Sequence, residues 1–339
     1  MKPSFAIIGC GRIAKRHAEQ INKVGTLLAV CDIVYENASE LAQQYNCNFY
    51  LSIEELLEKE PNVDTVSICT PNGLHAMHSI QSLQANKHVL CEKPLSISVA
   101  DANNMIAASK RSHKKLFVVK STRYNPIVLA VKNLINQNQL GKIFSFQLNC
   151  VWNRPEAYYK NSWKGSLALD GGTLFTQFSH YIDVILWFFG ETKTLQGFRT
   201  NASHLNSIEF EDCGAIAVEM ENGTLGAIHY SINAINKNQE VSLSIVAEKG
   251  TLKLGGEYLN ELLQQEPALI NMEELQIGNT ANDYGFYKGS MSNHDKVYEN
   301  IVKALNGQKS AFTDAEDALK TVAFIENFYN KTPVKNFPL

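Results

Sequence analysis

The chain has 339 residues and a formal net charge of -3, with 31 basic and 34 acidic side chains. This balance gives no reason to expect nucleic acid as a partner, and no apolar run approaches the roughly 20 residues that a membrane-spanning helix needs. The first eight residues hold too short an apolar stretch for a signal peptide, so we expect a cytoplasmic protein. The length allows two domains, each with its own core.

The chain contains seven cysteines, an odd number, and no two of them form a CxxC pair. Four of them end apolar runs, where a small thiol packs as a hydrophobic side chain: Cys10, Cys31, Cys69 and Cys91. We therefore expect reduced core thiols, and neither a disulfide framework nor a metal site.

Residues 4 to about 120 alternate short apolar runs with amphipathic segments. The runs that predict strands are Phe5–Ile8, Leu27–Cys31, Val63–Cys69, His88–Cys91 and Leu116–Val119. The segments that predict helices are Ile13–Val24, Tyr35–Tyr45, Ile53–Glu58, Leu74–Ala85 and Val99–Ser109. Strands separated by helices predict a parallel sheet with right-handed crossovers, and unbroken apolar runs suit strands buried on both faces.

The pattern changes after Asn125-Pro126. A helix is expected over Ile127 to Asn136, and then Phe144, Phe146, Leu148, Cys150 and Trp152 place apolar residues at every second position of a strand. Further strands are expected near 213–220, 224–232 and Val241–Ile245, with a hairpin turn at Asn222-Gly223. Helices are expected again over 294–306 and 314–329.

These two patterns predict an α/β protein with two domains. Residues 1–122 are expected to form a Rossmann domain, which is a doubly wound parallel sheet. Residues 123–339 are expected to form an α+β domain with a large, mostly antiparallel open sheet, for substrate binding and oligomerisation.

A glycine-rich turn follows the first expected strand. Gly9 allows the tight turn, Gly11 lets backbone N–H groups approach a pyrophosphate, and Ala14 lets the next helix pack closely on the strand. Asp32 ends the second strand, 21 residues after Gly11, as expected for a carboxylate that binds a ribose. Because this carboxylate would repel a 2′-phosphate and Ile33-Val34 offers no arginine, NAD is favoured over NADP.

Two later signals supply chemistry for hydride transfer. Cys91-Glu92-Lys93-Pro94 follows an apolar strand, and Gly171-Gly172 precedes Gln177, His180 and Asp183. Oxidation of a secondary alcohol sends a hydride to the nicotinamide and a proton to a base. Histidine is the natural base near pH 7, so His180 is our candidate, and Lys93 is the candidate for stabilising charge on the reacting oxygen.

These residues together resemble the glucose-fructose oxidoreductase / inositol dehydrogenase family over essentially the whole chain. The resemblance rests on GxGxxA at Gly9, on Asp32, on Thr70-Pro71-Asn72 with His75, on Glu92-Lys93-Pro94, and on the spacing GG-x₇-H-x₂-D. It implies an NAD-dependent dehydrogenase with Lys93 and His180 as catalytic residues and a cis peptide before Pro94. The implied cofactor-binding residues are Gly9, Gly11, Arg12, Ile13, Asp32, Thr70, Asn72, His75, Glu92, Lys93, Lys120 and Trp163.

Within that family, finer motifs are similar to those of bacterial dehydrogenases that oxidise C3 of UDP-N-acetylglucosaminuronate in lipopolysaccharide O-antigen pathways. The motifs include Lys120-Ser121-Thr122-Arg123-Tyr124-Asn125-Pro126, Trp152-x-Arg154-Pro155, Trp163-Lys164-Gly165 and Ser292-Asn293-His294. The implied substrate-binding residues are Lys93, Lys120, Arg123, Asn125, Arg154, Tyr158, Tyr159, Gln177, His180 and His294.

A cluster of cationic and aromatic residues on one expected loop supports an anionic sugar nucleotide. A guanidinium such as that of Arg154 binds carboxylate or phosphate in bidentate fashion, and the rings of Tyr158, Tyr159 and Trp163 can stack on a sugar or a base. A neutral polyol would not need this clustering, although a solvated basic loop over core aromatics would show the same residues.

One position departs from the family pattern. Many members carry an aspartate near position 176 as a partner for the histidine, and this chain has Thr176 there. Because threonine supplies no charge, the acid–base network is expected to differ from that of inositol dehydrogenases, which argues against a polyol substrate.

The sequence leaves other functions open. A dehydrogenase of another sugar or cyclitol, a glycosidase of this fold that uses tightly held NAD, and a non-catalytic sensor would share many of these features. Intact Lys93 and His180 weigh against the sensor. The alternating pattern of the expected sheet also predicts a homo-oligomer, either a dimer or a tetramer. If one face of the sheet were left uncovered, it would expose an apolar patch larger than monomers usually tolerate.

Overall fold

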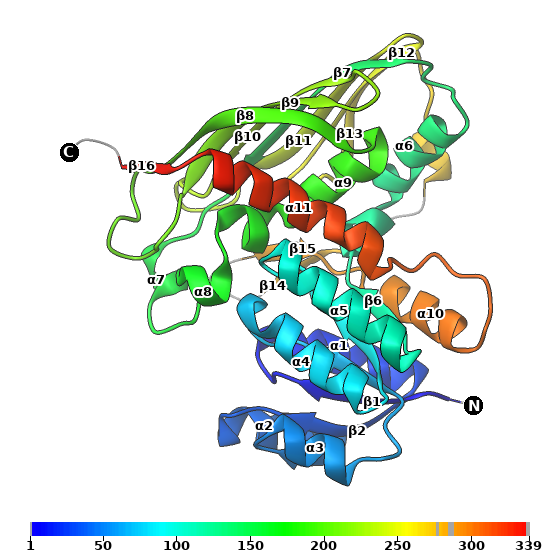
Figure 1. Cartoon of the computed structure of the whole chain (residues 1–339). Helices are drawn as coiled ribbons and strands as arrows, with labels where there is room; N and C mark the ends of the chain where they lie inside the picture. Colours follow the sequence, from blue (N-terminus) through cyan, green and yellow to red (C-terminus); the bar gives the residue numbers. More distant parts are fainter. Residues whose placement is uncertain (1, 276–277, 284–287, 337–339) are drawn as a thin grey trace. The chain divides into compact units, whose positions relative to one another are not determined.

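The computed structural model describes residues 2–275, 278–283 and 288–336. The chain divides into two compact units (Figure 1). Unit 1 contains residues 1–120 and 294–322, and unit 2 contains residues 121–293 and 323–339. The first crossing lies next to the expected domain boundary at residue 122. The return of residues 294–322 to unit 1 has no counterpart in that expectation.

Unit 1 is built on a six-stranded parallel sheet of strand order β3-β2-β1-β4-β5-β6. Its strands are β1 (Ser4–Ile8), β2 (Thr26–Cys31), β3 (Asn48–Tyr50), β4 (Thr65–Ile68), β5 (His88–Cys91) and β6 (Leu116–Val118). Its helices are α1 (Arg12–Val24), α2 (Tyr35–Tyr45), α3 (Ile53–Lys59), α4 (His75–Gln84), α5 (Val99–Ser112) and α10 (His294–Leu305), and α11 (Ala315–Lys331) begins here. This is the expected Rossmann architecture.

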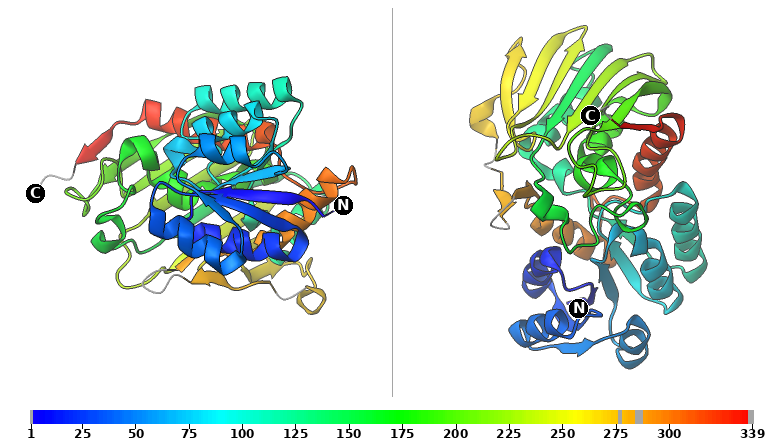
Figure 2. Two further views of the ribbon diagram at one scale, coloured as in Figure 1. Left: turned by 90° about the horizontal axis from the view of Figure 1, so that it is seen from below. Right: turned by 90° about the vertical axis from the view of Figure 1, so that its left-hand side faces the viewer.

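Helices cover both faces of this sheet. In the left view of Figure 2, α1 and α2 in dark blue lie on one face, and α4 and α5 in cyan lie on the other. The cover explains why β4 has every residue buried and why its sequence is continuously apolar or small. The short strand β3 was not predicted, because two of its three residues are exposed and it joins an edge of the sheet.

Unit 2 is built on an eight-stranded sheet of order β13-β12-β11-β7-β10-β9-β8-β16. Its strands are β7 (Ile143–Val151), β8 (Thr192–Asn201), β9 (Cys213–Met220), β10 (Leu225–Ser231), β11 (Glu240–Ala247), β12 (Gly250–Gly255), β13 (Glu261–Glu266) and β16 (Val334–Asn336), with a separate pair β14 (Ala281–Asp283) and β15 (Lys288–Met291). Neighbouring strands are antiparallel except β7 with β10 and β8 with β16, which agrees with the expected mostly antiparallel sheet.

Helices α6 (Pro126–Asn136) and α9 (Ser179–Phe189) of unit 2 lie against one face of this sheet (Figure 1). The short helices α7 (Glu156–Tyr159) and α8 (Leu167–Asp170) lie farther from the sheet, and short 3-10 and π-helical turns occur between the helices. Phe146 of β7 stacks on Phe189 of α9 with ring centroids 4.6 Å apart, and Leu148 and Cys150 are buried beside it. The alternation in β7 therefore faces α9.

Phe144 departs from that alternation and is 48% exposed. A register shift between Val246 and Ala247 of β11 explains this, because Ser145 pairs with Val246 and Ile143 with Ala247, which leaves Phe144 without a direct partner. The opposite face of the sheet carries no described helix, and Phe198 and Leu225 on its strands are 70% and 58% exposed.

All seven cysteines are free thiols. Burial is the main cause that raises their pKa values, which reach about 12 for Cys31 and about 11 for Cys47. None of the described helices is long and apolar enough to span a membrane.

Candidate active site

The glycine-rich turn joins β1 to α1 and has the geometry expected for a phosphate-binding loop. Gly9 has φ of +91°, and a Cβ there would lie 2.7 Å from the carbonyl carbon and oxygen of Cys69. Its N–H donates to the carbonyl of Cys31 at 2.8 Å, which ties the turn to β2. Only glycine satisfies both the positive φ and the close approach.

Gly11 precedes the first residue of α1 and has the opposite surroundings. A Cβ built on Gly11 would meet no atom within 4 Å, and both Gly11 and Arg12 are exposed. The first backbone N–H groups of α1 therefore lie at an open surface with the partial positive charge of a helix N-terminus. This half of the site fits the pyrophosphate of a dinucleotide.

The carboxylate of Asp32 is hydrogen-bonded to the glycine-rich turn. Its Oδ2 accepts a hydrogen bond from the N–H of Cys10 at 2.7 Å, and its Oδ1 accepts one from the N–H of Val34 at 2.8 Å. The carboxylate remains partly exposed, so it is available to a ribose as well as to the backbone. Sequence spacing predicts the ribose role, whereas the bond to Cys10 is visible only in the structure.

Lys93 follows β5 and is held at its backbone by Glu92. The N–H of Lys93 donates to Oε2 of Glu92 at 3.0 Å, and the Lys93-Pro94 peptide is cis, as the family resemblance implies. Oε1 of Glu92 accepts from Nε2 of His17 at 2.9 Å and from Nε2 of His294 at 3.1 Å. Glu92 therefore points into the interior of unit 1 and braces the lysine.

The three side chains His17, Glu92 and His294 form a buried cluster in which both histidines are bonded to the carboxylate. Nδ1 of His17 lies 2.8 Å from the hydroxyl of Tyr298, which lies 2.9 Å from that of Ser67. Burial lowers the pKa of His17, while hydrogen bonds from both histidines outweigh burial and hold the pKa of Glu92 well below its usual range. The carboxylate of Glu92 thus accepts a hydrogen bond from Nε2 of each histidine.

The same three residues have a donor set that is able to bind a metal ion, since their ligand atoms lie within 4.8 Å of one another. Sequence reasoning missed this cluster because His17, Glu92 and His294 are far apart along the chain. Both Glu92, expected to bind cofactor, and His294, expected to bind substrate, are buried in it, and those two roles stay predictions.

Thr70, Asn72 and His75 lie together after β4. Nδ1 of His75 is 2.7 Å from the carbonyl oxygen of Pro94, and its Nε2 is 2.9 Å from that of Thr70. Burial lowers the pKa of His75, so the neutral ring donates to one carbonyl at a time. The histidine thereby connects the turn after β4 to the Lys93-Pro94 segment.

Lys120 ends the N-terminal part of unit 1 and is 3% exposed. Its Nζ donates to Oγ1 of Thr321 in α11 at 3.3 Å. Its expected roles toward cofactor and substrate stay predictions.

His180 lies in the first turn of α9 and is 4% exposed. A π-helical turn over Leu174–Phe178 immediately precedes α9. Such turns are rare and are frequently found at functional sites, because the extra residue changes the direction of the following side chains. The π-helical turn therefore supports a functional role for the segment that contains His180.

Arg154 and Gln177, both expected to bind substrate, are paired in unit 2. Nε of Arg154 donates to Oε1 of Gln177 at 2.7 Å, and Nε2 of Gln177 donates to the hydroxyl of Tyr158 at 3.1 Å. The guanidinium carbon lies 4.8 Å from the centroid of the Trp152 ring and 5.3 Å from that of Tyr158. Its Nη1 also donates to Oδ1 of Asn238 at 3.1 Å, so the cation is buried and held from several sides.

The remaining aromatic residues of the loop lie around these groups. Tyr158 and Tyr159 are buried with ring centroids 5.0 Å apart, and Nζ of Lys164 lies 4.7 Å from the ring of Tyr158 and 5.1 Å from that of Trp163. The predicted cation-and-aromatic cluster exists within unit 2.

Arg123 and Asn125 have partners inside unit 2. The guanidinium of Arg123 forms a bidentate pair with Asp183, with two bonds of 2.7 Å, so the aspartate of the GG-x₇-H-x₂-D pattern anchors an arginine. The amide of Asn125 donates to the carbonyl of Tyr258 at 3.2 Å and accepts from Asn293 at 2.7 Å. These contacts stabilise the fold, and the substrate roles of both residues stay predictions.

The carboxylate of Asp170, which the sequence analysis did not single out, lies beside Thr176. The hydroxyl of Thr176 donates to Oδ1 of Asp170, and the N–H of Gly165 donates to Oδ2 of Asp170 at 2.9 Å. Asp170 is 1% exposed and directly precedes Gly171-Gly172. That position within the glycine pattern was the available sequence signal for this acid.

Comparison with known protein families identifies the class of enzyme to which this chain belongs. A model of an oxidoreductase family with an NAD-binding Rossmann fold matches residues 4–120, and the model of the C-terminal α/β domain of the same family matches residues 132–335. The chain belongs to the GFO/IDH/MocA oxidoreductase family. It is an NAD-dependent oxidoreductase, which confirms the resemblance, the fold class and the cofactor expected from the sequence.

Individual relatives are more distant. Glucose-6-phosphate 3-dehydrogenase of Bacillus subtilis (strain 168) is 29% identical over 189 residues, which are 55% of this chain and 53% of that enzyme. The chain thus aligns with about half the length of that relative. Oxidoreductase P35 of Formosa agariphila is 24% identical over 309 residues, which are 87% of this chain and 94% of that protein.

Among solved structures, two WlbA dehydrogenases in complex with NADH and UDP-GlcNAcA are similar over nearly the whole chain. The protein from Chromobacterium violaceum has a TM-score of 0.88 at 30% identity, covering 97% of this chain and 93% of its own. The protein from Bordetella pertussis has a TM-score of 0.86 at 29% identity, covering 98% of this chain and 96% of its own.

Gly9 and Gly11 provide a matched pair of variants for the phosphate-binding turn. Gly9→Ala is expected to lower the melting temperature, because its Cβ meets backbone of Cys69 at a positive φ. Gly11→Ala is expected to retain the melting temperature and to weaken NAD binding, because its Cβ enters the space that the pyrophosphate needs. Thermal unfolding and fluorescence titration with NADH measure the two effects; equal losses of stability in both variants would contradict the assignment.

Asp32 tests the choice of cofactor. Asp32→Ser is expected to weaken NAD binding and relax discrimination against NADP, because it removes the negative charge that would repel a 2′-phosphate. Titration of both nucleotides into wild type and variant measures the ratio of their dissociation constants. Wild-type protein that binds NADP as tightly as NAD would contradict this role of the carboxylate.

Proposed function

We propose that this protein oxidises the 3-hydroxyl of UDP-N-acetylglucosaminuronate to the 3-keto sugar, with NAD as the oxidant. The observation that supports it most is the similarity, over 97% of the chain, to a WlbA dehydrogenase in complex with NADH and UDP-GlcNAcA. The buried guanidinium of Arg154, bonded to Gln177 and bordered by Trp152 and Tyr158, adds a group suited to a carboxylate or phosphate. We place the reaction in the cytoplasm, in synthesis of a diamino-uronic sugar of lipopolysaccharide.

The proposed chemistry assigns one task to each catalytic residue. Bound NAD supplies the hydride acceptor, and the carbon that loses the hydride becomes the ketone carbon. His180 accepts the hydroxyl proton, and Lys93 donates a hydrogen bond to the same oxygen as negative charge develops on it. Glu92 and the carbonyl-bound His75 hold the Lys93-Pro94 segment, so the lysine starts from a fixed backbone.

Variants of the two catalytic residues test this chemistry. Lys93→Ala and His180→Ala are each expected to reduce kcat by about 10²-fold or more, the usual effect of losing a charge-stabilising or acid–base group. Both are expected to retain NADH binding, because neither belongs to the phosphate-binding turn. Initial rates across pH measure the loss, and near-normal turnover of His180→Ala would place the base elsewhere.

Substrate charge is tested at Arg154. Arg154→Gln is expected to lower kcat/KM for UDP-N-acetylglucosaminuronate by about a hundredfold, mainly through KM, because a buried charged partner is lost. Neutral UDP-N-acetylglucosamine is expected to be a much poorer substrate of the wild type. Steady-state rates with both sugar nucleotides measure this. Equal kcat/KM for the two, or better turnover of free inositol, would exclude the proposed substrate and leave the alternative of another sugar or cyclitol.

We also propose that the protein assembles as a homo-oligomer through the uncovered face of the eight-stranded sheet. The exposed Phe198 and Leu225 lie on strands of that sheet, and association of two such faces would bury them. Leu225→Glu is expected to shift a dimer or tetramer toward monomer, because it places a charge in the interface. Sedimentation at micromolar concentration measures this, and a wild-type monomer near 38 kDa would refute it.

A further inference from the structure

The loop between β8 and β9, residues 202–212, is folded around the carboxylate of Asp212. The N–H groups of Ala202 and Ser203 donate to it at 2.9 and 2.8 Å, and Asp212 is fully buried. Burial alone raises the pKa of Asp212, but the bonds from His204, Ser203 and Ala202 outweigh it and hold that pKa well below its usual range. The loop therefore contains a fixed negative charge.

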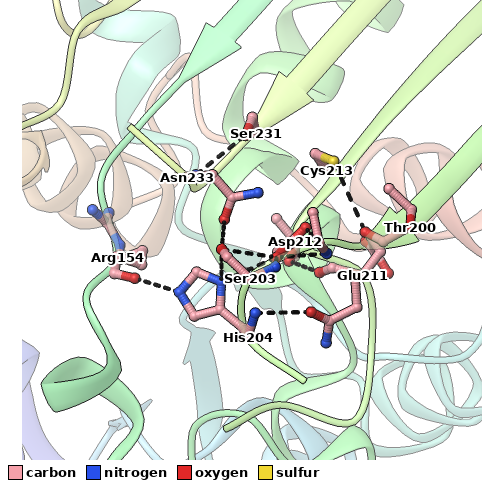
Figure 3. Close-up of polar contacts among 12 residues, drawn as sticks. Arg154, Thr200, Ser203, His204, Glu211, Asp212, Cys213, Ser231 and Asn233 are labelled. Carbon is pink, nitrogen blue, oxygen red and sulfur yellow. Dashed lines mark hydrogen bonds and ion pairs between the residues drawn. The ribbon is translucent and has the colours of Figure 1, made fainter. Parts of the chain in front are cut away.

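His204 lies between this carboxylate and the segment that carries Arg154 (Figure 3). Its Nδ1 is 3.1 Å from Oδ2 of Asp212, and its Nε2 is 2.8 Å from the main-chain carbonyl oxygen of Arg154. A carboxylate and a carbonyl only accept hydrogen bonds, so both bonds form together only when both ring nitrogens carry hydrogens. These two bonds are therefore complete only in the imidazolium, whereas in the neutral ring Nδ1 is able to accept instead from the hydroxyl of Ser203, 3.2 Å away.

The electrostatic surroundings of His204 act in the same direction. Burial lowers the pKa of His204, but the bonds to Asp212 and to the Arg154 carbonyl outweigh it, and the charge of Glu156 in α7 adds to them, so the pKa is raised above 6.5. Tyr159, also in α7, presents its ring to the imidazole with centroids 5.7 Å apart. The pKa of the Tyr159 hydroxyl is raised well above 10, chiefly by burial, so it is neutral there.

The loop contacts the Arg154 segment at a second place. The N–H of Glu209 donates to the carbonyl of Gly165 at 2.9 Å, and a carboxylate oxygen of Glu209 accepts from the N–H of Leu167 at 2.6 Å. A Cβ on Gly165 would lie 2.6 Å from the carbonyl oxygen of Ser207, so the two backbones are in close contact. The loop thus supports both ends of the segment with Arg154, Tyr158 and Tyr159.

We propose that His204 is a positioning residue, which as an imidazolium fixes the backbone of Arg154 and thereby the guanidinium that binds the anionic substrate. Loss of the proton removes one of its two bonds and loosens this attachment. The inference rests on the proposed role of Arg154 toward an anionic sugar nucleotide.

The proposal predicts a specific pH dependence of substrate binding. Because the pKa of His204 is raised in the folded protein, the attachment is complete at pH values well below 6.5 and is lost as pH rises through that raised value. Arginine stays charged, and the uronate and pyrophosphate stay ionised, throughout this range. His180, the proposed base, is expected to titrate in the same range, so only the part of the pH dependence that His204→Gln removes is assigned to His204.

The experiment measures the dissociation constant of UDP-N-acetylglucosaminuronate in the presence of NADH, a combination that does not turn over, by calorimetry from pH 5.5 to 8.5, where the uracil ring stays neutral. Wild type is expected to weaken about tenfold with increasing pH, the scale of one charge-assisted hydrogen bond. His204→Gln is expected to give a constant that is weaker than that of wild type at pH 5.5 and that changes less with pH. Asp212→Asn is expected to move the wild-type transition to lower pH, since it removes the charge that raises the pKa.

His229→Gln is the matched control. That histidine is exposed on β10 and hydrogen-bonded to Asn149 at 2.6 Å, away from the loop, so its replacement is expected to leave the wild-type profile unchanged. A flat wild-type profile overturns the inference without any variant, as does a wild-type pH dependence that persists undiminished in His204→Gln. If Arg154→Gln binds the acidic ligand as wild type does, the proposed function fails; if it binds weakly while His204→Gln matches wild type, only the inference fails.

Discussion

The buried carboxylate of Glu92 is the interaction on which unit 1 depends most. An ionised carboxylate is stable in a protein interior only when donors replace its lost water, and here they come from three separate parts of the chain. His17 belongs to the helix after the phosphate-binding turn, Lys93 follows directly, and His294 begins a helix 202 residues later. One acid therefore joins the cofactor turn, the lysine segment and the returning chain. This requirement explains why residues 294–322 belong to the first unit.

In unit 2, charged side chains are likewise held by hydrogen bonds, but here the charged groups are arginines and their partners are oxygen acceptors. Its guanidinium group at position 154 is buried and that at position 123 is partly buried, and each is held by oxygen acceptors. Asp183 neutralises the first, whereas amide and carbonyl oxygens hold the second. The bidentate ion pair commits Arg123 to the fold of unit 2. The proposed recognition role belongs to Arg154, whose described partners include amide and carbonyl oxygens.

The sequence predicted most of the fold because its signals are local. The parallel sheet, the hairpin at Asn222-Gly223 and the helix Tyr35–Tyr45 all follow from periodicity and turn chemistry. Strand β3 did not follow, since three mostly exposed residues carry no period. The return of α10 to the first unit also did not follow, because its cause is the contact of Tyr298 and His294 with His17 and Glu92. Long-range polar pairing leaves no local pattern.

The hydrogen bond from Thr176 to Asp170 bears on how related sequences are compared. Many family members carry an aspartate near position 176, and at that position this chain has only a hydroxyl group. In space the hydroxyl is attached to a carboxylate supplied six residues earlier, before the paired glycines. The hydroxyl and the carboxylate thus act as one unit although six residues separate them along the chain. A comparison of position 176 alone therefore overlooks the acid that lies beside it in the fold.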